Sequence, residues 1–127
     1  MFEFVTQHHF ALIVMVLLLM TLTACAARQH WHPAAVSKMD SAAYDVLLIA
    51  EATIDEARRQ FATAAEIPVV VKEPLNALIA SYNVARSAWL TYRGAVASNV
   101  PAQEYYATLS ANLASLSDAI RKLKEVQ

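Results

Sequence analysis

The feature that most constrains the fold is a repeat of apolar residues at alternating steps of four and three. It runs through three stretches of the chain. Its positions are Ala43, Leu47, Ala50, Ile54, Ala57, Phe61 and Ala64 in the first stretch, Leu78, Tyr82, Ala85, Trp89, Tyr92 and Val96 in the second, and Tyr106, Leu109, Leu113, Leu116, Ile120 and Leu123 in the third. This spacing places apolar side chains on one face of an α-helix. The sequence therefore predicts three amphipathic helices.

Prolines separate the three stretches. Pro68 and Pro74 interrupt the chain after the first, and Pro101 follows the second. Because proline suits the first turn of a helix, we expect the helices at about 34–65, 74–98 and 101–125. Short connections between such helices predict an all-α fold, an antiparallel up-down-up three-helix bundle. The only glycine, Gly94, lies inside the second helix, where we expect it to allow close approach of a neighbouring helix, the alternative being a slight kink.

An uncharged apolar run precedes the bundle at residues 10–27. Its length of about 18 residues is at the lower limit for spanning a bilayer, and its densest part matches the apolar core of a signal peptide. The run closes on Leu22-Thr23-Ala24-Cys25, which contains the only cysteine of the chain. This ending resembles the lipobox of bacterial lipoprotein precursors.

The resemblance implies that diacylglycerol is attached to the Cys25 sulfur and that a signal peptidase cuts between Ala24 and Cys25. Residues 1–24 would then be a signal peptide, 25–33 a tether and 34–127 the bundle. In enteric-type bacteria an Asp after the lipidated Cys retains the protein in the inner membrane. Ala26 occupies that position here, which favours the outer membrane, facing the periplasm.

The charges around the apolar run leave a second interpretation open. No Lys or Arg lies in residues 1–10, and the first basic residue, Arg28, follows the run. A signal peptide normally begins with a positive segment, and positive residues normally stay on the cytoplasmic side. The alternative is an uncleaved single-span anchor in the inner membrane, with the helical bundle on the cytoplasmic side.

Composition argues against several classes of function. The chain has ten Lys and Arg and eleven Asp and Glu, and only Glu3 among them precedes Cys25, so the remainder is nearly neutral. We therefore expect no nucleic-acid partner. The predicted helices contain no His, which disfavours haem and di-metal sites, and we expect no cofactor, no metal and no enzymatic activity. His30 and His32 are expected to lie in a solvated tether.

Two groups of residues are candidates for contact with a partner or a ligand. Val69, Val70 and Val71 are expected in the connection between the first two helices, as a hydrophobic plug over the bundle or as a partner surface. A second group could line a groove for a small apolar ligand or simply pack in the core: Tyr82, Trp89, Tyr92, Tyr105 and Tyr106. Tyr105 lies off the repeat and is the better surface candidate.

The sequence favours a structural or protein-interaction role in the cell envelope. Many repeat positions are Ala, so the core is thin, and a protein partner or self-association is expected. The alternatives are a bundle that oligomerises or bridges membranes, as phage lysis lipoproteins do, and a module that binds a small apolar ligand. The phage lysis proteins are commonly rich in proline, whereas this chain has four.

Overall fold

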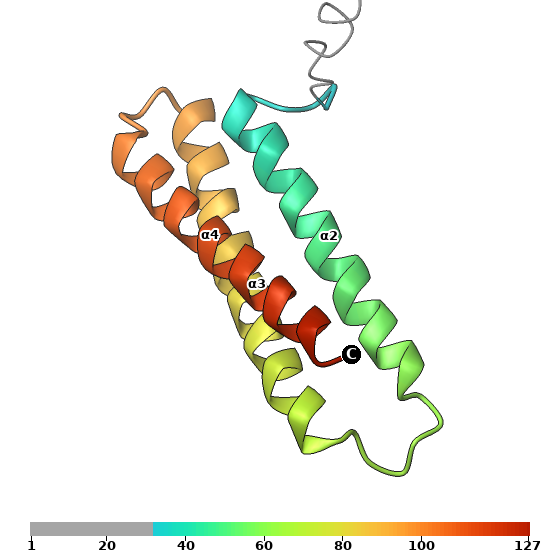
Figure 1. The fold of residues 1–127 in the computed structure, drawn as a ribbon. Helices are drawn as coiled ribbons and strands as arrows, with labels where there is room; N and C mark the ends of the chain where they lie inside the picture. Colours follow the sequence, from blue (N-terminus) through green and yellow to red (C-terminus); the bar gives the residue numbers. More distant parts are fainter. Residues whose placement is uncertain (1–31) are drawn as a thin grey trace, which may run out of the picture. The chain divides into compact units, whose positions relative to one another are not determined.

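The computed structural model describes residues 32–127, which form one compact unit. Within this range the chain forms three α-helices and no β-strand: α2 (Lys38–Gln60), α3 (Val69–Ala97) and α4 (Gln103–Glu125). Each helix runs antiparallel to the one before it, as Figure 1 shows, which confirms the predicted all-α three-helix bundle. The expected signal peptide, Ala24, Cys25 and the tether up to residue 31 lie outside the described residues.

The predicted apolar repeat forms the core. Most of its positions are buried, and four leucines are completely enclosed: Leu78, Leu109, Leu116 and Leu123. Burial of each such side chain contributes about 2 kcal/mol. Tyr82 and Trp89 of α3 are only half-buried and pack against the edge of the core. Ala64 lies beyond the end of α2, and Tyr106 remains exposed in the first turns of α4.

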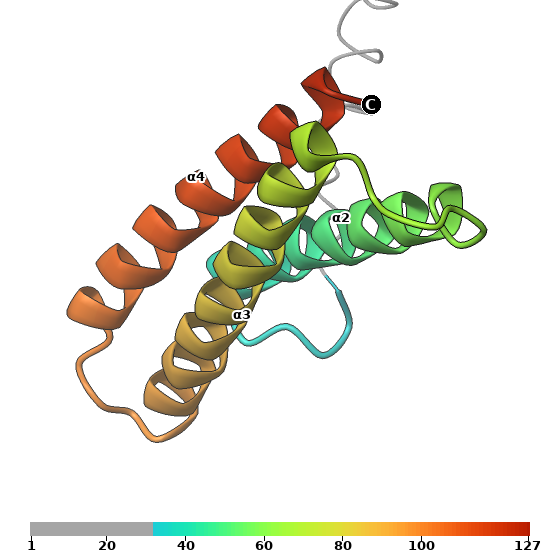
Figure 2. The ribbon, with the colours of Figure 1, turned by 90° about the horizontal axis from the view of Figure 1, so that it is seen from below.

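The helices do not contribute equally to this core. α3 and α4 pack against each other along much of their length, whereas α2 makes sparser contact with both. Figure 2 shows α2 crossing α3 at a wider angle than α4 does. We call the end of the bundle where α2 begins, α3 ends and α4 begins the tether end, and the opposite end the distal end. The bundle is therefore an α3–α4 hairpin with α2 laid across it.

The helix boundaries differ from the predicted ones at both ends of α2 and at the starts of α3 and α4. α2 begins at Lys38 rather than at residue 34, because Ser37 caps it through a hydrogen bond from the Asp40 amide. It ends at Gln60 rather than at residue 65. α3 begins at Val69, so Pro74 is its sixth residue and not part of its first turn. Pro74 lacks the amide that would bond the Val70 carbonyl, which is a tolerable loss near a helix start.

The connection between α3 and α4 is a compact helix cap. Asn99 adopts the left-handed conformation, with φ of 54°, which Asn tolerates better than most residues. The Val100 amide donates to the Ala95 carbonyl and the Asn99 amide to the Val96 carbonyl. These two bonds satisfy carbonyl groups at the end of α3. α4 then begins at Gln103, two residues after the predicted start at Pro101.

The expectation for Gly94 is wrong. A Cβ atom placed on this residue would meet nothing within 4 Å, and the residue is exposed. Gly94 therefore does not permit the approach of a neighbouring helix, and its φ is not positive. Nothing in the described structure requires glycine at this position.

Candidate functional site

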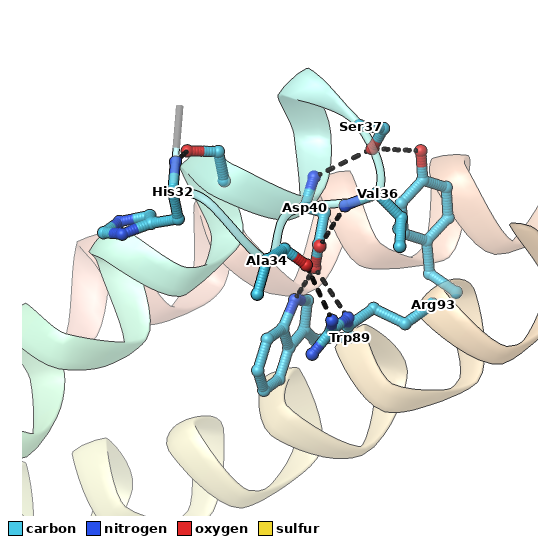
Figure 3. Close-up of polar contacts among 9 residues, drawn as sticks. His32, Ala34, Val36, Ser37, Asp40, Trp89 and Arg93 are labelled. Atoms are coloured by element: carbon cyan, nitrogen blue, oxygen red, sulfur yellow. Dashed lines mark hydrogen bonds and ion pairs between the residues drawn. The ribbon is translucent and has the colours of Figure 1, made fainter. Parts of the chain in front are cut away.

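The most specific cluster of side chains lies at the tether end, around Asp40 in the first turn of α2 (Figure 3). The Asp40 side chain is only 3% exposed. Its Oδ1 accepts a hydrogen bond of 2.5 Å from the Trp89 indole N–H and lies 3.3 Å from Arg93 Nε. Its Oδ2 accepts a bond of 2.8 Å from the Val36 amide. A carboxylate of α2 is thus held by two side chains of α3 and by the chain that precedes α2.

A second set of contacts ties the same segments together. Ser37 Oγ accepts from the Asp40 amide at 3.0 Å and lies 2.9 Å from the Tyr92 hydroxyl. An Arg93 amino group donates to the Ala34 carbonyl at 3.1 Å. We call these interactions of Ala34, Val36, Ser37, Asp40, Trp89, Tyr92 and Arg93 the Asp40 clasp. The clasp fixes residues 34–37 against the end of α3.

Local sequence explains how each side of the clasp is formed. Ser37 and Asp40 are three residues apart, the spacing at which a cap residue and an acidic residue serve the first turn of a helix. Trp89 and Arg93 are four residues apart on α3 and therefore share one face. The Arg93 guanidinium lies over the Trp89 ring, 5.2 Å from its centroid, as cation–π pairs do.

The electrostatics of the clasp are balanced. A buried carboxylate is costly unless it is paired and hydrogen-bonded, and Asp40 has both a cationic partner and further donors. Among the described residues, no buried side-chain nitrogen or oxygen lacks a hydrogen-bond partner. The clasp is therefore built to hold the chain in place, and it leaves no buried acid or base unpaired for proton transfer.

A pocket of about 310 Å³ lies beside the clasp. It is lined by His32, Pro33, Ala34, Ala35, Asp40, Ser41, Tyr44, Trp89 and Arg93. The ring centroids of Tyr44 and Trp89 are 6.1 Å apart, and those of His32 and Tyr44 are 4.4 Å apart. This volume is at the lower limit of pockets that bind small molecules. Aromatic walls with a few polar groups suit a small apolar ligand.

His32 is not part of a solvated tether, contrary to expectation. Its Nε2 lies 2.6 Å from Asp45 Oδ1, and its amide donates to Ser41 Oγ at 3.3 Å. The ring also packs edge-on against Tyr44. The ordered chain therefore begins at least six residues before α2, and the predicted tether 25–33 is shortened at its C-terminal end.

The predicted partner surface is divided by the structure. Val69, Val70 and Val71 form the first turn of α3 rather than a connection. Val71 is buried at 3% exposure, as a plug would be, whereas Val69 and Val70 are 71% and 62% exposed. Tyr105 lies near the start of α4, at the opposite end of the bundle (Figure 1). The valines and Tyr105 therefore cannot form one surface.

The five aromatic candidates do not line a single groove. Trp89 lines the clasp pocket, whereas Tyr105 lines a groove between α3 and α4 with a volume of about 580 Å³. Tyr82 donates to Glu51 of α2, and burial together with this bond raises the pKa of its hydroxyl. Tyr92 is buried and its ring packs edge-on against that of Tyr106. Trp89, Tyr105 and Tyr82 thus line three different pockets, and of these three only the one beside Trp89 has a second aromatic wall, Tyr44.

Sequence reasoning missed the clasp. Asp40, Ser37 and Arg93 were not candidates, although the Ser37-x-x-Asp40 spacing was a visible signal for a helix start. The pairing of Asp40 with α3 had no such signal, because Trp89 lies 49 positions further along the chain. Within residues 32–127 no group of three His, Cys, Asp or Glu is arranged for a metal ion, and no helix has the length and apolarity needed to cross a membrane.

Comparison with known proteins adds no relative: no protein-family model, no curated protein and no solved structure matches the chain.

Proposed function

We propose that the chain is a small lipoprotein of the bacterial envelope, attached to the membrane through acyl chains on Cys25. The observation that carries this proposal is Leu22-Thr23-Ala24-Cys25 at the end of an apolar run, with the only cysteine of the chain in the lipidated position. Two or three acyl chains give stable attachment, at about 0.8 kcal/mol per buried CH₂. The bundle would then be held at the outer membrane, facing the periplasm.

The role proposed for the bundle is structural or protein-binding rather than catalytic. The surface best suited to a protein partner is the distal start of α3, where Val69 and Val70 present aliphatic side chains to solvent. Exposed ion pairs lie on the distal parts of α2 and α4, among them Arg59 with Glu56 and Arg121 with Asp118. Apolar side chains together with polar and charged ones are the usual composition of a protein-binding surface.

Lipidation is tested by growing cells that express the full chain with radioactive palmitate. We expect label on the wild-type protein and none on Cys25→Ala, and a mature mass that begins at Cys25 with diacylglycerol and an N-acyl group. An unlabelled wild-type protein would contradict the proposal. A mass that retains residues 1–24 would support the single-span anchor instead.

The membrane assignment is tested by Ala26→Asp, which introduces the retention signal of the lipoprotein family. If the chain follows the outer-membrane route, this variant should move to the inner-membrane fraction while keeping its palmitate label. Ala27→Asp is the matched control, because it adds the same charge one residue later. Wild-type protein in the inner-membrane fraction would contradict an outer-membrane location and leave lipidation unaffected.

The clasp pocket favours a second candidate function, the binding of a small apolar ligand. Trp89 forms a wall of this pocket, so a bound ligand should alter its fluorescence. Titration of Trp31→Phe, in which Trp89 is the only tryptophan, with a panel of fatty acids and aromatic compounds tests this function. Saturable changes that Tyr44→Ala abolishes would support it, and the absence of any response would exclude it for that panel.

A further inference from the structure

The clasp limits how far the bundle can lie from a lipid anchor. His32 contacts Ser41 and Asp45 of α2, so the chain is held against the bundle from this residue on. Six residues separate Cys25 from His32 in the sequence. Fully extended, a chain of this length reaches about 25 Å. This distance is shorter than α3, whose 29 residues extend for about 44 Å.

The two ends of the bundle differ in charge. The distal end carries twelve charged residues: Asp55, Glu56, Arg58, Arg59, Glu66, Lys72, Glu73, Asp118, Arg121, Lys122, Lys124 and Glu125. At the tether end, the buried Asp40 pairs with Arg93, and the remaining charged side chains are Lys38, Asp45, which contacts His32, and Glu104. The tether end is therefore much easier to remove from water than the distal end.

Apolar side chains are exposed on all three elements that meet at the tether end. Val36 precedes α2, Val100 lies in the α3–α4 connection and Tyr106 lies near the start of α4, and their exposed fractions are 42%, 46% and 45%. Aromatic rings with a polar group, such as Tyr106, are favoured at the boundary between headgroups and acyl chains. We call Val36, Val100 and Tyr106 the tether-end face.

We propose that the tether-end face rests on the lipid headgroup region, so that the bundle stands on the membrane with Val69 and Val70 pointing away from it. This inference rests on the proposed lipidation of Cys25, because the short tether is what brings the face to the bilayer. Three observations carry it: the packing of His32 against α2, the low charge of this end and the apolar side chains exposed there. The occupant of the face is a lipid surface rather than a second copy of the chain.

The test places a thiol-reactive, environment-sensitive fluorophore on the full chain, purified from membranes and reconstituted in vesicles of phosphatidylethanolamine and phosphatidylglycerol. Val100→Cys places the dye on the tether-end face, and Tyr106→Cys is a second position on the same face. Val69→Cys is the matched control at the distal end, and Leu48→Cys reports on the side of α2. The parent chain, which carries no introduced cysteine, shows whether Cys25 itself reacts with the dye.

We expect the dye at Val100 and Tyr106 to shift to the blue and to be quenched by lipids that carry a nitroxide near the headgroup, with neither effect at Val69. Vesicle-bound protein with equal responses at Val100 and Val69 would overturn the inference and leave the lipidation proposal intact. A stronger response at Leu48 than at Val100 would overturn it in favour of a bundle lying on α2.

Two further outcomes separate the remaining explanations. A blue shift at Val100 that persists in detergent, together with cross-linking between Val100→Cys chains, would show that a second copy covers the face and would overturn the inference. Failure of the protein to float with vesicles, together with dye on Cys25 of the parent chain, would overturn the lipidation proposal and this inference with it.

Discussion

The two ends of the bundle are held together in different ways. At the tether end, Asp40, Ser37 and Ala34 meet residues of α3 that are 49, 55 and 59 positions away. At the distal end, the ion pairs join residues three or four positions apart on the same helix, as in Arg59–Glu56 and Lys122–Asp118. Exposed pairs of this kind contribute little to stability, because water and salt screen the two charges.

The difference shows that the specific polar contacts between separate segments of the chain lie at the tether end. A buried polar network fixes one arrangement of the segments it joins, whereas surface ion pairs along one helix fix none between helices. The chain thus defines its geometry most strictly where it would leave for the membrane. The distal end is left with exposed valines and solvated charges, which suits contact with a partner.

The largest expected effects come from replacing buried leucines. They test whether the two ends of the bundle differ only in their polar contacts or also in their apolar core. Leu109 and Leu123 are both fully buried on α4, the first towards the tether end and the second at the distal end. Leu109→Ala and Leu123→Ala should each lower the free energy of unfolding by about 3 kcal/mol, through lost burial and the cavity left behind. Urea denaturation of the full chain in detergent measures both. A much smaller loss of unfolding free energy for one of the two variants would mean that the apolar core is also packed less tightly at that end.

Breaking the clasp should have the next largest effect. Asp40→Asn removes the charge that faces Arg93 and presents an amide donor to groups that are themselves donors, so we expect a loss of about 2 to 3 kcal/mol. Asp55→Asn is the matched control, because it makes the same change in the exposed distal pair with Arg58. That control should change stability by about 0.5 kcal/mol or less. Equal losses would refute the distinction between the two ends.

Removing the helix cap should have a smaller effect. Ser37→Ala loses the bond to the Asp40 amide and the contact with Tyr92, and we expect a loss of about 1 kcal/mol. Tyr92→Phe is the partner variant, which removes the second contact and keeps the cap. Denaturation of both variants separates the contribution of the helix cap from that of the contact between Ser37 and Tyr92. An unchanged stability in Ser37→Ala would show that water replaces the serine hydroxyl.

A stabilising substitution is expected close to the clasp. Gly94 lies exposed within α3, with open space around its Cα, so Gly94→Ala should raise the stability by about 0.5 to 1 kcal/mol. Ala80→Gly, at an exposed site in the middle of the same helix, should have the opposite effect. Thermal unfolding measures both. A loss of stability in Gly94→Ala would indicate that α3 needs its flexibility at this end.

The smallest expected effect concerns the distal charges and depends on pH. Hydrogen bonds from Lys122 and Arg121 lower the pKa of the Asp118 carboxyl. A group whose pKa is lowered by folding contributes stability above its unfolded value, near pH 4, and loses that contribution as the pH falls through the folded value. Carbon NMR titration should find the Asp118 pKa below that of an ordinary Asp. Lys122→Gln should move it upwards, and an unshifted value would show that the pair is broken in solution.

The fold could be predicted from the sequence because the spacing of apolar residues is enough to show which face of each helix is buried. Leu78, Leu113 and Ile120 were placed in the core by their spacing, and the structure buries each of them. The starts of α2 and α3 were misplaced for local reasons. Residues 34–36 are compatible with a helix, so the Ser37 cap was overlooked. The valines before Pro74 suggested a connection, although burial of Val71 outweighs the modest helix propensity of valine.

The candidate site could be predicted only in part. The aromatic residues of α3 were recognised, but their division among the clasp pocket, the core and the α3–α4 groove depends on tertiary packing. The carboxylate that organises the clasp is a single Asp on a helix, and nothing in its neighbours shows that it meets Trp89 and Arg93. The lipid attachment at Cys25 lies outside the described residues and stays a prediction.

The most direct test of this account is hydrogen exchange at the Val36 amide, measured by NMR on the full chain in detergent micelles. This amide precedes α2 and is held by Asp40 Oδ2 at 2.8 Å. The account predicts that it exchanges slowly in the wild-type protein and at the rate of an open chain in Asp40→Asn, while the amide of Leu116 stays protected in both. Rapid exchange of Val36 in the wild-type protein would contradict the clasp, and with it the short tether on which the membrane-facing arrangement depends.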